Sequence, residues 1–282
     1  TDEEGRILTE SKRNPIDDIT MIETELDNWI YDIINKDWDQ IGRTSTGDKK
    51  KFINLLSDKL SGLSINQNQI NLSIKNLKLE TKNITEFGNE DKMRFVSEIR
   101  KISKPIIIAG NKIDLAETND YENIKKEGIE IIPTASEAEL LLRRASENEI
   151  INYVPGNNQY TISEDKEITK QQINALETVK KQVLDRWQTT GVQQVLNYAF
   201  FNLLDMITVY PVEDENKYMN KKGNVLPDAY LLKNSSTAKD LAFKIHSEIG
   251  NKFLYAIDAR TKKRLSNDYV LKNNDIIKIV ST

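Results

Sequence analysis

The chain has 282 residues, of which 38% are hydrophobic, and this length is enough for two domains. Its net charge of −4 argues against a protein that wraps nucleic acid over its whole surface. It has no cysteine and one histidine, which excludes disulfide frameworks, zinc–thiolate sites and multi-histidine metal centres. No apolar run approaches the ~20 residues that span a bilayer and no secretory signal is visible, so we expect a cytoplasmic protein without a membrane partner.

The first hundred residues are typical of helices separated by short polar loops. The polar start, Thr1 followed by DEEGR, leads us to expect an excerpt of a longer protein. An N-cap and a proline at positions 14 and 15 predict a helix to about residue 34. Further helices are expected over 49–60, 67–77 and 91–102. The face of the first helix is predicted by apolar residues at three- and four-residue spacing, namely Ile16, Ile19, Ile22, Leu26, Trp29, Ile30 and Ile33.

A parallel βαβ unit is predicted next. The runs 105–109 and 129–132 are short, apolar and rich in β-branched residues, and a helical stretch over 120–126 separates them. Strands buried on both faces of a parallel sheet have this composition. Helices are expected to follow over 137–145, 168–187 and 192–205.

The last part of the chain predicts a smaller α+β module. Strands are expected over 207–212, 229–232, 253–258 and 276–280, with a helix over 238–249 that begins after Ser235–Thr237 and ends at Gly250. This ββαββ order resembles the β-grasp, or ubiquitin-like, fold.

The most specific motif is Asn111-Lys112-Ile113-Asp114, which directly follows the apolar run. Ligands of nucleotide-binding α/β domains lie at the carboxyl ends of the parallel strands. An aspartate there accepts hydrogen bonds from N1–H and the N2 amino group of guanine, a pair that adenine lacks. Lys112 would cover the base plane with its stem, and Asn111 would tie the loop to its neighbours. The alternative is a solvated turn, which Asn and Asp also favour.

Longer stretches carry a family resemblance. The segments IIIAGNKID, IIPTASEAELLLRRA, INYVPG, VLDRWQTTGVQQVLN and GNVLPDAYLLKNSSTAKDLAFKIHSEIG resemble the Obg-like, YchF-related GTPases, in the archaeal and eukaryotic branch that keeps a guanine-type motif. The resemblance implies an α/β protein: a partial Ras-like P-loop GTPase domain with an all-helical insertion, followed by a β-grasp TGS domain. It implies a remnant of the GTPase domain at 1–13, the insertion at 14–103, the later half of the GTPase domain at 104–206 and the TGS domain at 207–282.

The resemblance also implies the guanine-binding residues. The family's base-recognition roles fall on Asn111, Lys112 and Asp114, and its second base loop falls on residues 134–136, where Ser136 stands in a reversed Thr-Ala-Ser order. Some relatives replace the lysine and aspartate of the first motif and prefer ATP, so the presence of Asp114 favours GTP or GDP as the ligand. Mg²⁺ would accompany the nucleotide, bound with a P-loop half that we expect this stretch to lack.

The phosphate-binding string G-x-x-x-x-G-K-[ST] does not occur in these residues. The most similar string runs from Gly42 to Lys49, has Asp48 where the lysine is needed, and is interpreted as a surface loop. We therefore expect weak GTP binding and no GTP hydrolysis from this 282-residue stretch alone.

Charge suggests a second role. Residues 205–282 carry 13 Lys or Arg against 10 Asp or Glu, whereas the rest of the chain carries 27 against 34. A predicted turn near two tyrosines gathers four candidate RNA-binding residues: Arg260, Lys262, Lys263 and Arg264. The alternative is a solvated hairpin. The TGS resemblance implies RNA or the ribosome as a partner, through the TGS and helical domains. We expect the protein to be a monomer.

Two readings of function therefore stay open. One is a guanine-nucleotide switch that acts on the translation machinery. The other is a non-enzymatic RNA-binding or docking module in which the motif at Asn111 is vestigial. His246 is interpreted as structural or merely exposed rather than catalytic. The three tryptophans, Trp29, Trp38 and Trp187, are interpreted as core or inter-helix packing residues.

Overall fold

The computed structural model describes residues 15–79, 84–116 and 118–282, so the remnant predicted at 1–13 lies outside the described residues. Two compact units divide the chain: Thr1–Ile106 with Thr118–Glu130, and Ile107–Glu117 with Ile131–Thr282. The predicted domain boundaries stay predictions. No helix in the described part of the chain is long and apolar enough to cross a membrane.

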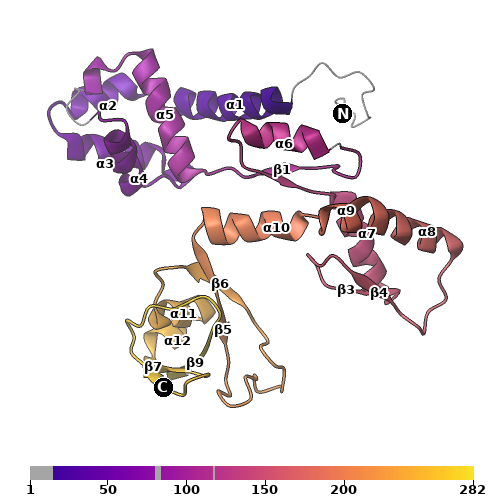
Figure 1. Cartoon of the computed structure of the whole chain (residues 1–282). Helices are drawn as coiled ribbons and strands as arrows, with labels where there is room; N and C mark the ends of the chain where they lie inside the picture. The colour runs from indigo at the N-terminus through magenta and orange to yellow at the C-terminus, as the bar shows by residue number, and fades with distance from the viewer. Residues whose placement is uncertain (1–14, 80–83, 117) are drawn as a thin grey trace. The chain divides into compact units, whose positions relative to one another are not determined.

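The described part of the first unit is helical (Figure 1). Its helices are α1 (Pro15–Asn35), α2 (Trp38–Thr44), α3 (Lys49–Lys59), α4 (Gln67–Asn76), α5 (Asn89–Ser103) and α6 (Thr118–Lys126), with 3₁₀ turns at Ser61–Leu63 and Ile84–Glu86. The predicted helices are confirmed, and α2 is an addition. The interpretation of 42–49 as a surface loop is wrong at its start, because Gly42 is buried within α2. At its end, Asp48 caps α3 by accepting a hydrogen bond from the backbone of Lys51.

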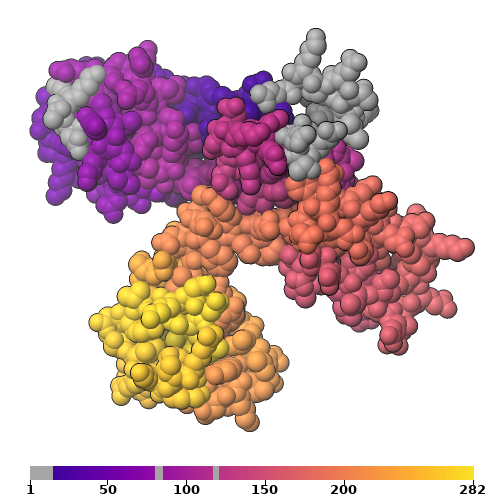
Figure 2. All heavy atoms as spheres, in the orientation of Figure 1, coloured from indigo at the N-terminus to yellow at the C-terminus, as the bar shows by residue number. Residues whose placement is uncertain are grey.

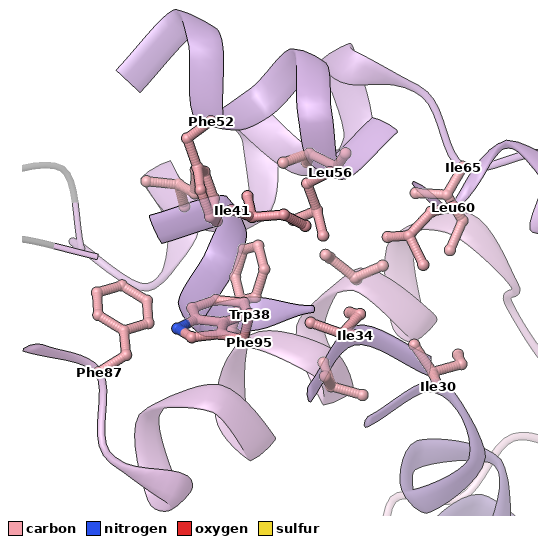
Figure 3. Close-up of a cluster of buried hydrophobic side chains, with 14 residues drawn as sticks. Ile30, Ile34, Trp38, Ile41, Phe52, Leu56, Leu60, Ile65, Phe87 and Phe95 are labelled. Atoms are coloured by element: carbon pink, nitrogen blue, oxygen red, sulfur yellow. The ribbon is translucent and has the colours of Figure 1, made fainter. Parts of the chain in front are cut away.

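An aromatic cluster forms the centre of the helical core (Figure 3). The ring of Trp38 lies 5.5 Å from that of Phe52, 5.7 Å from Phe87 and 6.0 Å from Phe95. The packing role predicted for Trp38 is confirmed. Trp29 is different: its side chain is 52% exposed, so the predicted apolar face of α1 is only partly buried.

A buried ion pair joins α1 to α5. The Nε of Arg100 donates to Asp27 at 2.6 Å, and the hydroxyl of Ser97 donates to the same carboxylate at 2.7 Å. The Arg100 side chain is only 4% exposed, so the carboxylate compensates a charge that water does not reach.

The second unit begins with a parallel strand pair. Strand β1 (Ile108–Gly110) pairs in parallel with β2 (Ile131–Pro133), as the βαβ pattern predicts. Helix α7 (Ser136–Glu147) follows. The antiparallel hairpin of β3 (Ile151–Tyr153) and β4 (Tyr160–Ile162) was not predicted. Helix α8 (Lys170–Val179) continues through a π-helical turn at Lys180–Leu184 into α9 (Asp185–Trp187), and α10 (Val192–Asn197) continues through Tyr198–Leu203.

The C-terminal module is a β-grasp fold, as predicted. Its elements are β5 (Met206–Pro211), β6 (Tyr230–Lys233), α11 (Ala238–Ile245), α12 (Ser247–Asn251), β7 (Phe253–Asp258), β8 (Arg264–Leu265) and β9 (Asp275–Ser281). The strand order is β6-β5-β9-β7-β8, with β5 and β9 parallel. Figure 2 shows one face of this module, coloured orange to yellow, in the space-filling view.

The helix predicted over 238–249 is interrupted. His246 adopts an extended backbone conformation, with φ −164° and ψ 142°, which ends α11. Its Nδ1 accepts a hydrogen bond from the backbone N–H of Glu248 at 3.2 Å and so caps α12. The structural role predicted for this histidine is confirmed, although it stands between two helices rather than within one.

Candidate functional site

The loop after β1 carries the Asn-Lys-Ile-Asp motif. Ile113 is 1% exposed and belongs to the core formed with α7 and β3, so the middle of the motif is anchored. Lys112 has a φ of 66°, a left-handed conformation that is uncommon for residues other than glycine. The loop closes as the backbone N–H of Leu115 donates to the carbonyl of Lys112 at 3.0 Å.

A second loop, after β2, lies against the first. The N–H of Thr134 donates to the carbonyl of Gly110 at 2.8 Å, and the N–H of Ile113 donates to the carbonyl of Thr134 at 3.2 Å. The side-chain oxygen of Asn111 accepts a hydrogen bond from the backbone N–H of Ser136 at 3.0 Å. The structure thus brings together two site residues that lie 25 positions apart in the sequence.

Asp114 is the chemically available member of the motif. Its side chain is half-buried, and among the described residues its carboxylate makes no hydrogen bond or ion pair. Hydrogen-bond donors stabilise a half-buried carboxylate. The two carboxylate oxygens of Asp114 are therefore suited to a ligand that brings two N–H groups.

The second loop uses its own N–H groups internally. The N–H of Ala135 donates to the carbonyl of Thr190 at 2.8 Å, and the N–H of Ser136 is taken by Asn111. A ligand oxygen would meet the next backbone donors, because the first turn of a helix leaves its N–H groups without partners in the helix. In α7 these belong to Glu137 and Ala138.

A buried carboxylate lies one turn further along α7. Glu139, which is 3% exposed, accepts hydrogen bonds from the hydroxyl of Thr190 at 2.5 Å, the hydroxyl of Tyr153 at 2.8 Å and Nε of Arg143 at 2.6 Å. Burial alone raises the pKa of Glu139, but the three hydrogen bonds and the charge of Arg143 outweigh it and hold this pKa below its usual range. The same environment raises the pKa of Tyr153 to about 12, through burial and the bond to Glu139.

The segment 186–191 supports both loops. A guanidinium nitrogen of Arg186 donates to the carbonyl of Ala116, just beyond the motif, at 3.0 Å. Gly191 has a φ of 77°, and a Cβ there would lie 1.7 Å from the carbonyl oxygen of Pro133. Only glycine therefore fits against the end of β2. Glu139, Arg186, Thr190 and Gly191 lie in segments that carry the family resemblance, but no local motif assigned any of them a role at the site.

The four basic candidates make different contacts and do not form one group in the structure. Arg260 donates to the backbone carbonyl of Asn274 at 3.1 Å. Lys262 donates to the backbone carbonyl of Glu215 and lies 5.6 Å from the ring centroid of Tyr218. Lys263 is an exposed residue of the turn, and Arg264 begins β8 with its guanidinium 3.7 Å from the ring centroid of Tyr255. The single predicted turn therefore ends before Arg264.

No group of three or more His, Cys, Asp or Glu side chains in the described part of the chain is placed to hold a metal ion.

The fold and the two loops define the class of protein: a GTPase-like α/β fold joined to a TGS domain. Residues 109–214 match the family described as "Obg-like GTPase YGR210-like, G4 motif-containing domain", and residues 217–281 match the TGS domain family. An uncharacterised GTP-binding protein from Methanocaldococcus jannaschii is 45% identical over 284 residues, which cover 100% of this chain and 70% of the relative. The chain belongs to this family of Obg-like GTP-binding proteins.

Two solved structures are similar. The crystal structure of a GTP-binding protein from Pyrococcus horikoshii OT3 has a TM-score of 0.75 and 40% identity, over 97% of this chain and 73% of that one. The Schizosaccharomyces pombe YchF GTPase has a TM-score of 0.51 and 15% identity, over 99% of this chain and 69% of that one. The second likeness supports the predicted fold.

Proposed function

We propose that the two loops recognise the guanine base of GTP or GDP, with Asp114 as the specificity residue. The observation that carries this proposal is the half-buried carboxylate of Asp114, which has no partner among the described residues and follows a strand whose neighbouring loop is fixed by Asn111 and Ser136. Its two oxygens accept from N1–H and the N2 amino group of guanine. The stem of Lys112 covers the base plane.

Guanine is distinguished from adenine because only guanine donates two hydrogen bonds to the carboxylate of Asp114. Adenine presents no N–H at ring position 1 and no amino group at position 2, so it would leave the carboxylate of Asp114 desolvated and unpaired. Leaving a charged group unpaired after the bound ligand has excluded water from it costs on the order of 3 kcal/mol, which corresponds to about a hundredfold in binding.

Phosphate and Mg²⁺ binding need groups that these residues do not contain. The string G-x-x-x-x-G-K-[ST] does not occur in the sequence, and phosphoryl transfer depends on such a loop for positioning and charge stabilisation. We therefore assign base selection, and no step of GTP hydrolysis, to these residues.

The proposal is tested by the substitution Asp114→Asn, with Asp165→Asn, at an exposed position, as the control. Binding of GDP, ADP and xanthosine diphosphate is measured by ligand-observed NMR, which detects weak complexes. We expect Asp114→Asn to weaken GDP binding by about a hundredfold and to favour the xanthine nucleotide, because its amide donates to the oxygen at position 2 of xanthine. Unchanged GDP preference in this variant would contradict the assignment.

RNA or the ribosome is the partner that the charge distribution favours. Residues 205–282 have an excess of 3 positive charges, against an excess of 7 negative charges in the rest of the chain. A positive surface contributes sequence-independent attraction to phosphates. A gel-shift assay of the chain with ribosomal RNA at several salt concentrations tests this part. Affinity that does not fall as salt rises would contradict it.

A further inference from the structure

We propose that the groove beside β7 and β8 binds an unpaired RNA base, which stacks on the guanidinium of Arg264. This inference rests on the proposed RNA role and specifies its site. The groove has a volume of about 520 Å³, and its lining includes Lys239, Phe253, Leu254, Tyr255, Arg264 and Ser266.

The stacking surface is already formed. Arg264 pairs with Ile257 across the two strands, so it lies on the same face of the sheet as Tyr255, two residues earlier in β7. Its guanidinium lies 3.7 Å from the centroid of the tyrosine ring. One side of this planar cation is therefore covered by Tyr255. Arg264 is exposed, so the other side is accessible to a second flat ring, and guanidinium planes are surfaces on which splayed RNA bases stack.

The sheet edge leaves room for that ring. Strand β8 pairs only with Ala256 and Ile257, so among the described residues no strand runs beside Phe253–Tyr255 at this edge. Leu254 in this stretch is 53% exposed. Since a strand would otherwise fill the space, the short β8 is what creates the groove.

Charge favours a nucleotide as the occupant. The lining residues contain the cations of Lys239 and Arg264 and no Asp or Glu. The ammonium of Lys239 lies 6.0 Å from the ring centroid of Phe243, which is 43% exposed. A base on Arg264 with its phosphate near Lys239 uses both cations, whereas an added peptide strand would use neither for its backbone.

The experiment compares a ~12-nucleotide single-stranded RNA with an abasic strand of the same length, which keeps the phosphates but has no bases. Binding of both to the 282-residue chain is measured by fluorescence anisotropy. The variants are Arg264→Lys, which keeps the charge and removes the plane, and Lys239→Gln. Lys221→Gln is the matched control, because Lys221 belongs to the same module and its side chain is 88% exposed.

We expect Arg264→Lys to weaken binding of the intact RNA by about tenfold and binding of the abasic strand by less than twofold. Lys239→Gln should weaken both strands, and Lys221→Gln neither by more than about twofold. If the wild-type chain binds both strands equally, or Arg264→Lys binds the intact RNA as well as wild type, the stacking site is wrong while the RNA role stands. If neither strand binds, the RNA role and the stacking site both fall, and a protein partner becomes the occupant to test.

Discussion

The substitution Glu139→Gln tests whether the buried carboxylate stabilises the part of the fold that carries the two loops proposed to bind the base. The charged side chain accepts three hydrogen bonds of 2.5–2.8 Å and is 3% exposed. Hydrogen bonds to charged groups contribute about 1.5–3 kcal/mol each, and these share one acceptor group, so they do not add. The paired Arg143 side chain is 41% exposed, which reduces the cost of leaving it unpaired. We expect a loss of about 3 kcal/mol in the free energy of unfolding.

Hydrogen-exchange mass spectrometry measures this loss locally, on peptides that cover β2 and the first turns of α7. A loss of about 3 kcal/mol accelerates exchange through unfolding by about a hundredfold. Glu147→Gln is the control, since it changes an exposed glutamate of the same helix and should shift stability by less than about 0.5 kcal/mol. Equal exchange in Glu139→Gln and Glu147→Gln would refute the argument.

The pH dependence gives a second measurement with a defined sign. The pKa of Glu139 is lower in the folded state than in the unfolded chain, so its contribution is present above the ordinary glutamate pKa of 4.5. That contribution is lost as the pH falls through the folded-state pKa. The difference in stability between wild type and Glu139→Gln should therefore be largest at neutral pH and shrink below pH 4.5. A difference that stays constant down to pH 3 would rule out ionisation as its source.

The remaining predictions concern packing in each unit. Gly191→Ala should destabilise the chain by about 3 kcal/mol more than Gly223→Ala in urea unfolding, because both have positive φ but only the first meets a backbone carbonyl; equal costs would exclude the close approach as the reason. Asp27→Asn should cost about 2 kcal/mol, since it removes the nearer of the two carboxylates that pair with buried Arg100 and leaves Glu23 at 3.6 Å, whereas exposed Glu25→Gln should change stability little. Unfolding followed by tryptophan fluorescence measures the second pair, and similar midpoints would contradict it.

Elements marked by local periodicity could be predicted from the sequence. The helix predicted from 14 to 34 is observed as Pro15–Asn35, because its N-cap, proline and apolar spacing act within a few turns. The parallel pairing of β1 and β2 follows in the same way from two short apolar runs separated by a helix.

Burial on one helix was harder to predict. Trp29 has the spacing of a core residue yet is 52% exposed, because which part of an apolar face is covered depends on the partner helices. Helix α2 has only 7 residues and its stability comes from Trp38 in the aromatic cluster, a tertiary effect with no periodic signal.

The candidate site also has a part that local sequence predicts and a part that depends on tertiary contacts. The motif at 111–114 identifies the atoms proposed to face the base, but the positions of these atoms depend on residues distant in sequence. Glu139 is bonded to a hydroxyl 51 positions later, and the carbonyl of that residue, Thr190, accepts the N–H of Ala135 in the second loop. No spacing rule connects these positions, so only the folded chain reveals them.

Substitutions at Asp114 and at Glu139 should affect nucleotide binding in two different ways, one through base preference and the other through overall affinity. Asp114 touches the proposed base directly, so its substitution should change which base is preferred. The side chain of Glu139 makes no proposed contact with the base and bonds to Thr190, whose carbonyl holds Ala135 of the second loop, so its loss should weaken all nucleotides alike. The ratio of GDP to xanthosine diphosphate binding therefore distinguishes a residue that reads the base from one that holds the loop in place.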